Sequence, residues 1–147
     1  MTLLDIFAAR KRIAPFVHRT PIVESAWLSD LAGARVSLKL ESLQRSGSFK
    51  ARGAFNAVSA RLERGEIANH SRLVTASAGN HGRGLAAAAE TFGLPLVVFT
   101  PADAPHTKVS AIRRHGAELR AEGRDYAHAE ILARSAFATQ LAEILSR

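Results

Sequence analysis

The sequence predicts an α/β protein in which a mostly parallel sheet is flanked by helices. Short apolar runs of strand length occur at Leu73–Ala76, Leu96–Phe99 and Ala117–Arg120. Helix-forming stretches separate them, an alanine-rich one over 84–90 and a second one over 108–115. Strands that alternate with helices form parallel sheets covered by helices, and ligands of such sheets gather at the carboxyl ends of the strands.

The segments before these runs continue the same order. Residues 1–35 are interpreted as an amino-terminal arm that begins amphipathic and reaches a turn at Gly33. Residues 36–40 alternate apolar and polar side chains, which predicts a half-buried strand. From Ser48 onward apolar residues recur at helical spacing, with Gly65 as the stop. The strand and helix repeats then extend over residues 36–125.

The last segment, residues 126–147, is predicted to be one long helix with an apolar face. The apolar side chains assigned to that face are Ile131, Leu132, Phe137, Leu141 and Leu145. An apolar face at the end of the chain also offers a seam for a homo-oligomer.

Composition excludes several classes of protein. The chain has 147 residues, 47% of them hydrophobic, which suits one ordinary core. The absence of cysteine excludes disulfides, thiolate metal sites and a cysteine nucleophile, and favours a cytoplasmic location. No apolar run approaches the roughly 20 residues that cross a bilayer, so no membrane association is expected. The net charge of +7 attracts anionic partners, but few aromatic residues accompany the arginines, which disfavours nucleic-acid binding.

The first chemical motif is Ser46-Gly47-Ser48-Phe49-Lys50-Ala51-Arg52-Gly53-Ala54. It places the Lys50 amine at the amino end of a helix, with Arg52 two residues later as a further positive charge. Such surroundings disfavour a charged amine and suit a nucleophile toward a carbonyl group. The alternative is an ordinary solvated lysine at a helix start, which holds for most isolated lysines.

The second motif is Ser77-Ala78-Gly79-Asn80-His81-Gly82, between a strand and a helix. Gly79 is expected to take unusual backbone angles, so that successive amide groups point toward one carboxylate or phosphate. Asn80 suits an oxygen on a cofactor ring, although a turn asparagine is the simpler reading of its spacing. His81 is either a proton shuttle or a capping group. The other histidines lack metal-ligand spacing, and no metal site is predicted.

Together these motifs resemble the serine/threonine dehydratases, which are pyridoxal-phosphate enzymes of the tryptophan-synthase beta fold. Glu41-Ser42-Leu43-Gln44 before the lysine motif belongs to the same pattern, and the resemblance extends from about residue 5 to Asp125. Two motifs in the right order are more specific than one glycine-containing loop.

The resemblance implies a role for each residue of the motifs. Lys50 forms the Schiff base with pyridoxal 5'-phosphate and serves as the base at the substrate α carbon, with Phe49 beside the cofactor ring. Asn80 binds the ring hydroxyl. The substrate carboxylate is held by Ser77, Ala78, Gly79, Asn80 and His81. The implied reaction converts L-serine or L-threonine to pyruvate or 2-oxobutanoate and ammonia.

Two departures from the family pattern limit this transfer. Serine racemases of the family have a serine where this chain has Ala78, so racemisation lacks its second base and dehydration is favoured. The family also binds the cofactor phosphate in a run of glycines in a later domain, whereas no two glycines are adjacent here. We therefore expect an amino-terminal fragment without the phosphate-binding domain and with negligible activity alone. A pseudoenzyme or interaction module is the alternative.

Overall fold

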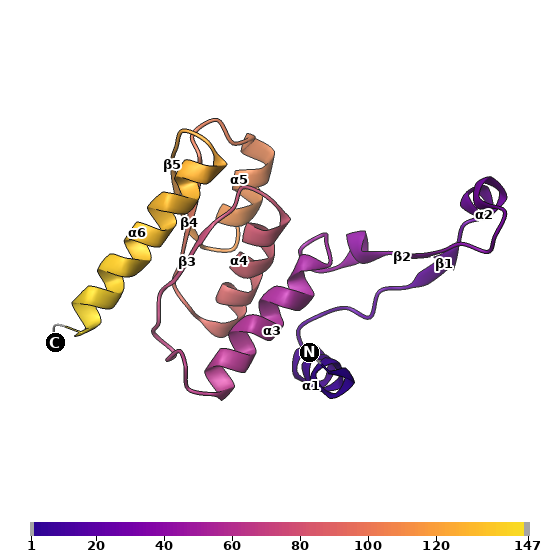
Figure 1. The fold of residues 1–147 in the computed structure, drawn as a ribbon, viewed down its shortest axis with the longest axis horizontal. Helices are drawn as coiled ribbons and strands as arrows, with labels where there is room; N and C mark the ends of the chain where they lie inside the picture. The colour runs from indigo at the N-terminus through magenta and orange to yellow at the C-terminus, as the bar shows by residue number, and fades with distance from the viewer. Residues whose placement is uncertain (1, 146–147) are drawn as a thin grey trace.

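A computed structural model describes residues 2–145, with side chains through residue 140, and confirms the predicted α/β class. Figure 1 shows a central sheet with helices on both sides and a thin arm that extends away from it. The elements are α1 Leu3–Ile13, β1 Ile22–Glu24, α2 Ala26–Ala32, β2 Ser37–Lys39, the 3-10 turn η1 Glu41–Leu43, α3 Lys50–Glu63, β3 Leu73–Ala76, α4 Asn80–Phe92, β4 Leu96–Pro101, α5 His106–Arg113, β5 Glu118–Gly123 and α6 Tyr126–Leu145.

The central sheet contains β3, β4 and β5 in that order, all parallel. In the register, Leu73 pairs with Leu96, and Val97 pairs with Glu118. The three strands lie where the apolar runs of the sequence predict them. Each is connected to the next through a helix, which is the connection that parallel strands require.

The middle strand β4 is buried on both faces because side chains alternate along a strand. Leu96 and Val98 pack into a core formed with α3, α4 and α5. Val97 and Phe99 point the other way, into a smaller core beneath α6. The sheet thus forms the middle layer of the body, with α4 and α5 on one face and α6 on the other (Figure 1).

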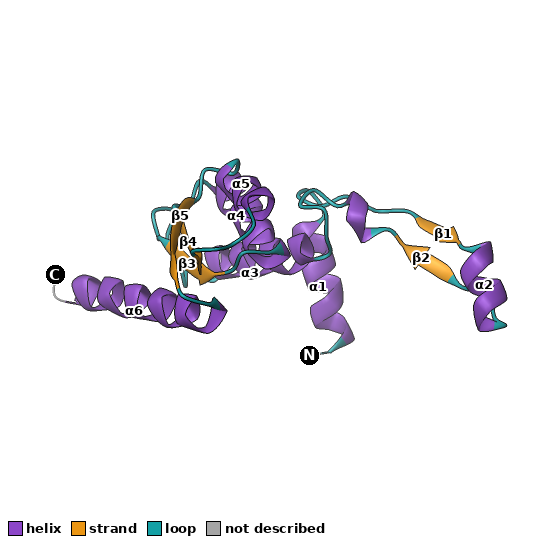
Figure 2. Cartoon of the chain, turned by 90° about the horizontal axis from the view of Figure 1, so that it is seen from above, coloured by secondary structure: helices purple, strands orange, loops and turns teal. Residues whose placement is uncertain are grey.

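The predicted strand at 36–40 differs from observation in its burial and its partner. It is observed as β2, which pairs antiparallel with β1 and does not join the parallel sheet. All three of its residues are exposed. The reason is topological: the short helix α2 connects β1 to β2, so the two strands form a separate two-stranded sheet. Figure 2 shows this arm projecting from the body with α2 at its far end.

The helix stops follow the glycines that the sequence indicates. The helix α3 ends just before Gly65, which has a φ of +68°. Gly93 ends α4 in the left-handed conformation, with a φ of +65°. The helix expected over 108–115 is observed two residues earlier, because it begins directly after Pro105.

The helix α6 forms as predicted over its described length, but its apolar side chains do not share one face. Ala129, Ala133 and Leu132 pack against the sheet. Ile131 and Phe137 are 59% and 55% exposed. Small alanines let the helix lie close to β3 and β4, which directs the larger side chains elsewhere. The side chains of Leu141 and Leu145, and all of Ser146, lie outside the described residues. No helix within residues 2–145 is long and apolar enough to cross a membrane.

Candidate active site

Lys50 is the first residue of α3, as predicted, and its side chain is exposed. Its Nζ lies 4.8 Å from the centroid of the Phe49 ring. That ring is also accessible, with Phe49 60% exposed. A primary amine and an aromatic face therefore stand side by side on the same surface.

A carboxylate clamp fixes the loop that leads to Lys50. Arg52 Nε donates to Glu41 Oε2 at 2.9 Å, and Arg52 Nη2 donates to Oε1 at 2.7 Å. The Thr20 hydroxyl donates to the same Oε1 at 2.6 Å. Arg52 is therefore not an unpaired charge beside the lysine, as its position in the sequence predicts, because η1 brings Glu41 against the first turn of α3. The pairing gives no signal in the local sequence pattern.

Gln44 ties the same loop to the amino-terminal segment. Its side-chain oxygen accepts from the His18 backbone N–H at 2.8 Å, and its Nε2 donates to the His18 carbonyl at 2.9 Å. Gln44 and Ser46 are both buried. The backbone between η1 and α3 is thus held at several points, which favours a fixed position for the lysine.

The clamp also changes the acidity of Glu41. The Arg52 guanidinium, hydrogen-bonded to the carboxylate, lowers the pKa of Glu41 to about 2. Glu41→Gln is expected to lower the free energy of unfolding at pH 7 by about 1–3 kcal/mol, because an ionised carboxylate with a lowered pKa stabilises the folded state. This contribution is complete above the ordinary glutamate pKa of 4.5 and is lost as the pH falls toward 2.

Urea unfolding of the wild type and Glu41→Gln between pH 7 and pH 2 checks this prediction. The two proteins should converge in stability at the acid end. Glu66→Gln is the matched control, because Glu66 and its partner Arg64 have side chains 48% and 56% exposed. An exposed pair of this kind contributes about 0–1 kcal/mol. A Glu41→Gln difference that persists undiminished at pH 2 contradicts the prediction.

The second motif forms the start of α4, where Ser77 acts as an internal cap. Ser77 Oγ accepts from the backbone N–H groups of Gly79 at 3.2 Å and Gly82 at 2.9 Å. Ser77 is buried. Both acceptor positions of its hydroxyl are thus used by the loop itself, which leaves only the hydroxyl proton for a ligand.

The backbone of Gly79 is not unusual, so that expectation is wrong. Its φ of −126° and ψ of −154° lie in the extended region. A Cβ at this position would meet no atom within 4 Å, so the loop surface is open there. The backbone N–H groups of Ala78, Asn80 and His81 donate to no atom in the described part of the chain. These three groups are free at a helix start, where anions are stabilised.

Close packing between α3 and α4 brings the two motifs together. A Cβ added to Gly84 would lie 3.1 Å from the Lys50 carbonyl carbon and 3.2 Å from the Ala51 nitrogen. Gly47, with a φ of +71°, lies against the Arg83 side chain, since a Cβ there would be 3.0 Å from Nη1. The lysine motif and the amino end of α4 are therefore in direct contact, and Figure 1 shows the two helices side by side.

A cavity of about 300 Å³ opens at this amino end of α4. Of the predicted site residues, Gly79 and Asn80 line it, whereas Lys50, Phe49, Ser77, Ala78 and His81 do not. The full lining is Gly79, Asn80, Arg83, Thr107, Lys108 and Ala111. The three residues from α5 were not predicted, because nothing in the local sequence indicates that the starts of α4 and α5 lie together.

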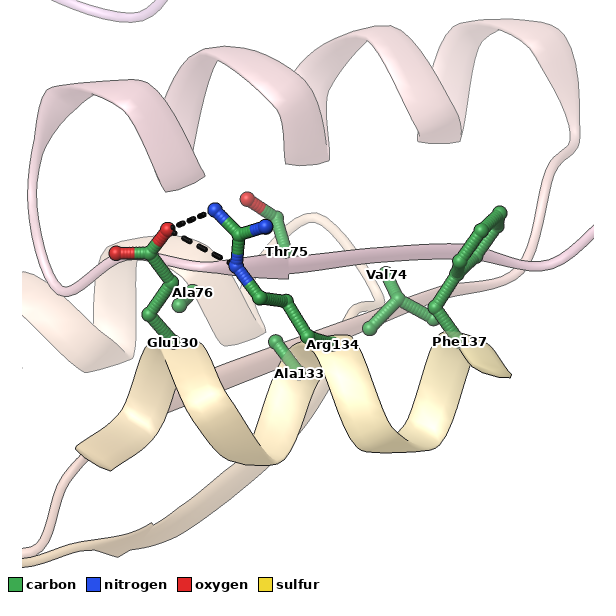
Figure 3. Close-up of a pocket in the computed structure, with 7 residues that line it drawn as sticks. All are labelled: Val74, Thr75, Ala76, Glu130, Ala133, Arg134 and Phe137. Atoms are coloured by element: carbon green, nitrogen blue, oxygen red, sulfur yellow. Dashed lines mark hydrogen bonds and ion pairs between the residues drawn. The ribbon is translucent and has the colours of Figure 1, made fainter. Parts of the chain in front are cut away.

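A second hollow, of about 420 Å³, lies between β3 and α6 on the other face of the sheet. Figure 3 shows Arg134 reaching back along α6 to Glu130, with Nη2 donating to Oε1 at 2.7 Å, while Phe137 and Val74 lie at the other end. The residues that line this hollow include no member of either motif. It is therefore separate from the candidate active site.

Comparison with known proteins identifies the family. The sequence pattern of the family described as "Pyridoxal-phosphate dependent enzyme" matches residues 13–144, so the chain belongs to this family. It is 42% identical over 123 residues to the L-threonine ammonia-lyase of Thermotoga maritima, covering 84% of this chain and 30% of that protein. It is 44% identical over 115 residues to the L-threo-3-hydroxyaspartate ammonia-lyase of a Pseudomonas species, covering 78% of this chain and 35% of that protein.

A solved structure shows the same relation. The threonine deaminase of the organism abbreviated T.th. matches with a TM-score of 0.79 and 41% identity, covering 92% of this chain and 41% of that one. The chain thus has the fold of these pyridoxal-phosphate enzymes and spans about a third of the length of the curated relatives it matches.

The residues that the structure brings together fit pyridoxal phosphate. The Lys50 amine and the Phe49 ring are both accessible. The surface at Gly79 is open, and the first turn of α4 contains no acidic side chain that would repel an anion. Within residues 2–145, no three histidine, aspartate or glutamate side chains are placed to hold a metal ion.

Proposed function

We propose that this chain supplies the lysine and the carboxylate-binding loop of a pyridoxal-phosphate-dependent ammonia-lyase. The reaction removes water and ammonia from L-threonine or L-serine, with net formation of 2-oxobutanoate or pyruvate. The observation that carries the proposal is the contact of Gly84 with the Lys50 backbone, which joins the two motifs. The substrates named for both relatives above carry a β-hydroxyl group, which supports elimination at that position.

Each residue of the motifs has a distinct task in this proposal. Lys50, Phe49 and Asn80 hold the cofactor, which when bound supplies an electron sink for charge at the substrate α carbon. Lys50 Nζ takes the proton from that carbon. The free N–H groups of Ala78, Asn80 and His81 bind the substrate carboxylate and orient the Cα–H bond.

Residue 78 favours dehydration over racemisation. Racemisation needs a second proton-transferring group on the opposite face of the α carbon from the lysine. Ala78 has only a methyl group and cannot move a proton. The side chains that choose between serine and threonine do not follow from the two motifs.

We place the contacts to the cofactor phosphate in the part of the relatives that this chain does not match. Charge-assisted hydrogen bonds to phosphate are among the strong ones, so their absence would weaken cofactor binding and leave turnover by the 147-residue chain negligible. The test of the proposal therefore uses covalent capture and not turnover.

Incubation with pyridoxal phosphate followed by borohydride reduction is expected to label Lys50 before the other three lysines, Lys11, Lys39 and Lys108. Peptide mass spectrometry locates and quantifies the label. Lys50→Arg keeps the positive charge but removes the primary amine, and we expect it to reduce total labelling at least roughly tenfold at limiting cofactor, a difference of about 1.4 kcal/mol in capture.

Lys11→Arg is the matched control, because Lys11 is an exposed lysine on α1, outside both motifs. It should leave labelling of Lys50 unchanged. Circular dichroism confirms that each variant is folded. Equal labelling of Lys50 and Lys11 in the folded wild type would refute the assignment.

A further inference from the structure

The cavity at the start of α4 has two walls, one from each of two helix amino ends. Gly79, Asn80 and Arg83 form the first wall, and residues 107–111 of α5 form the second. The helices are held together directly behind it, since a Cβ on Gly82 would lie 3.1 Å from the Ile112 Cδ1. The walls are therefore fixed relative to each other.

Both walls carry positive charge without a matching negative charge. Arg83 lies in the first turns of α4, and Lys108 lies in the first turn of α5. Neither first turn contains an acidic residue. Within the described chain neither cation forms an ion pair, and Asp103, before α5, is exposed and does not line the cavity. A cation at the positive end of a helix is unfavourable, so two of them facing one cavity raise its positive potential further.

Arg83 shows the same imbalance at the level of a single atom. Its Nε is buried and has no hydrogen-bond partner among the described residues. Its Nη1 lies next to Gly47, in the lysine motif. A buried donor of a charged group is costly when unsatisfied, and the guanidinium is the side chain that best matches the two oxygens of a carboxylate or phosphate.

We propose that this cavity binds an oxyanion, either a carboxylate or a phosphate group, in addition to the α-carboxylate of the substrate. The main-chain N–H groups of Ala78, Asn80 and His81 already provide for the α-carboxylate, and this distinction rests on the proposed function. Arg83 and Lys108 together supply two full charges that a single α-carboxylate does not require. The second oxyanion is carried either by the amino acid side chain or by a separate small molecule.

Titration of the ¹⁵N-labelled 147-residue chain tests this site without pyridoxal phosphate. Inorganic phosphate, at constant ionic strength set with sodium chloride, is expected to shift the amide signals of Gly79 and Ala111 saturably. Arg83→Gln and Lys108→Gln should each weaken this binding by a factor on the order of ten, the effect of losing one charge-assisted hydrogen bond. Arg113→Gln, at the exposed carboxyl end of α5, removes the same charge and should leave binding unchanged.

L-aspartate and L-asparagine distinguish the two sources of the anion, because they differ only in the charge of the side chain. Tighter binding of aspartate that depends on Lys108 places the anion on the amino acid. Saturable phosphate binding with equal, weak binding of the two amino acids places it on a separate molecule.

The proposal is overturned if phosphate shifts do not saturate, or if Lys108→Gln binds phosphate as the Arg113→Gln control does. Lys108 is exposed, so this variant decides the question even if Arg83→Gln fails to fold. Failure of Lys50 to react with pyridoxal phosphate would leave this titration unaffected, which separates the two proposals.

Discussion

Replacement of Gly84 by leucine is expected to force α3 and α4 apart and to abolish preferential labelling of Lys50. The added Cβ alone would lie 3.1 Å from the Lys50 carbonyl carbon, and the obstacle is backbone that cannot rotate away. Overpacking of this kind destabilises by about 1–3 kcal/mol or more, and we expect at least about 2 kcal/mol here. Urea unfolding followed by circular dichroism measures the stability, and borohydride labelling measures the site.

Gly53→Ala is the matched control for this substitution. Gly53 is also a helical glycine, in α3, but a Cβ there would meet no atom within 4 Å. Alanine is the better helix former by about 1 kcal/mol, so this variant should be unchanged or more stable. If Gly84→Leu were as stable and as well labelled as Gly53→Ala, the contact between the motifs would not matter for the site.

Phe55→Ala is expected to produce the largest loss of stability in the chain. Phe55 is fully buried and lies five residues after Lys50 on α3. Its ring stacks on Phe16 with centroids 5.5 Å apart and meets Phe92 of α4 edge-on at 6.1 Å. Removal of a buried phenylalanine side chain costs about 3–5 kcal/mol, a large part of the stability of a small domain. Urea unfolding should show this loss, and labelling of Lys50 should fall with it.

Phe137→Ala is the control, because Phe137 is 55% exposed and lines the separate hollow beneath α6. Its loss should cost less than about 1 kcal/mol, as for most surface substitutions. Equal effects of the two substitutions would mean that the aromatic cluster does not hold α3 in place.

The parallel sheet could be predicted from the sequence because its signals are local. The runs at 73–76, 96–99 and 117–120 are short, apolar and separated by helix formers, and the order of strands follows from their order in the chain. The glycines after α3 and α4 likewise mark their own helix ends.

The arm could not be predicted in the same way, because its structure depends on pairing between distant residues. The alternation at residues 36–40 indicates a strand but not its partner, and β1 at Ile22–Glu24 is too short to stand out. Burial failed for the same reason: alternation predicts a covered face, but nothing in the described chain covers β2.

The candidate site divides along the same line. The motifs indicated Lys50 and the loop at 77–81, since each is continuous in sequence. The clamp between Glu41 and Arg52, the internal capping by Ser77 and the approach of Lys108 to Arg83 all depend on how elements pack. Sequence reasoning therefore identified the reactive groups but not the groups that position them or that add charge beside them.

The chain contains a single tryptophan, Trp27, which is 73% exposed in α2 at the far end of the arm (Figure 2). An indole ring already surrounded by water changes its emission little when the distant sheet unfolds. Intrinsic fluorescence of this protein is therefore a poor reporter of denaturation but a direct optical reporter of any molecule that covers the arm, through a shift of the emission to shorter wavelength.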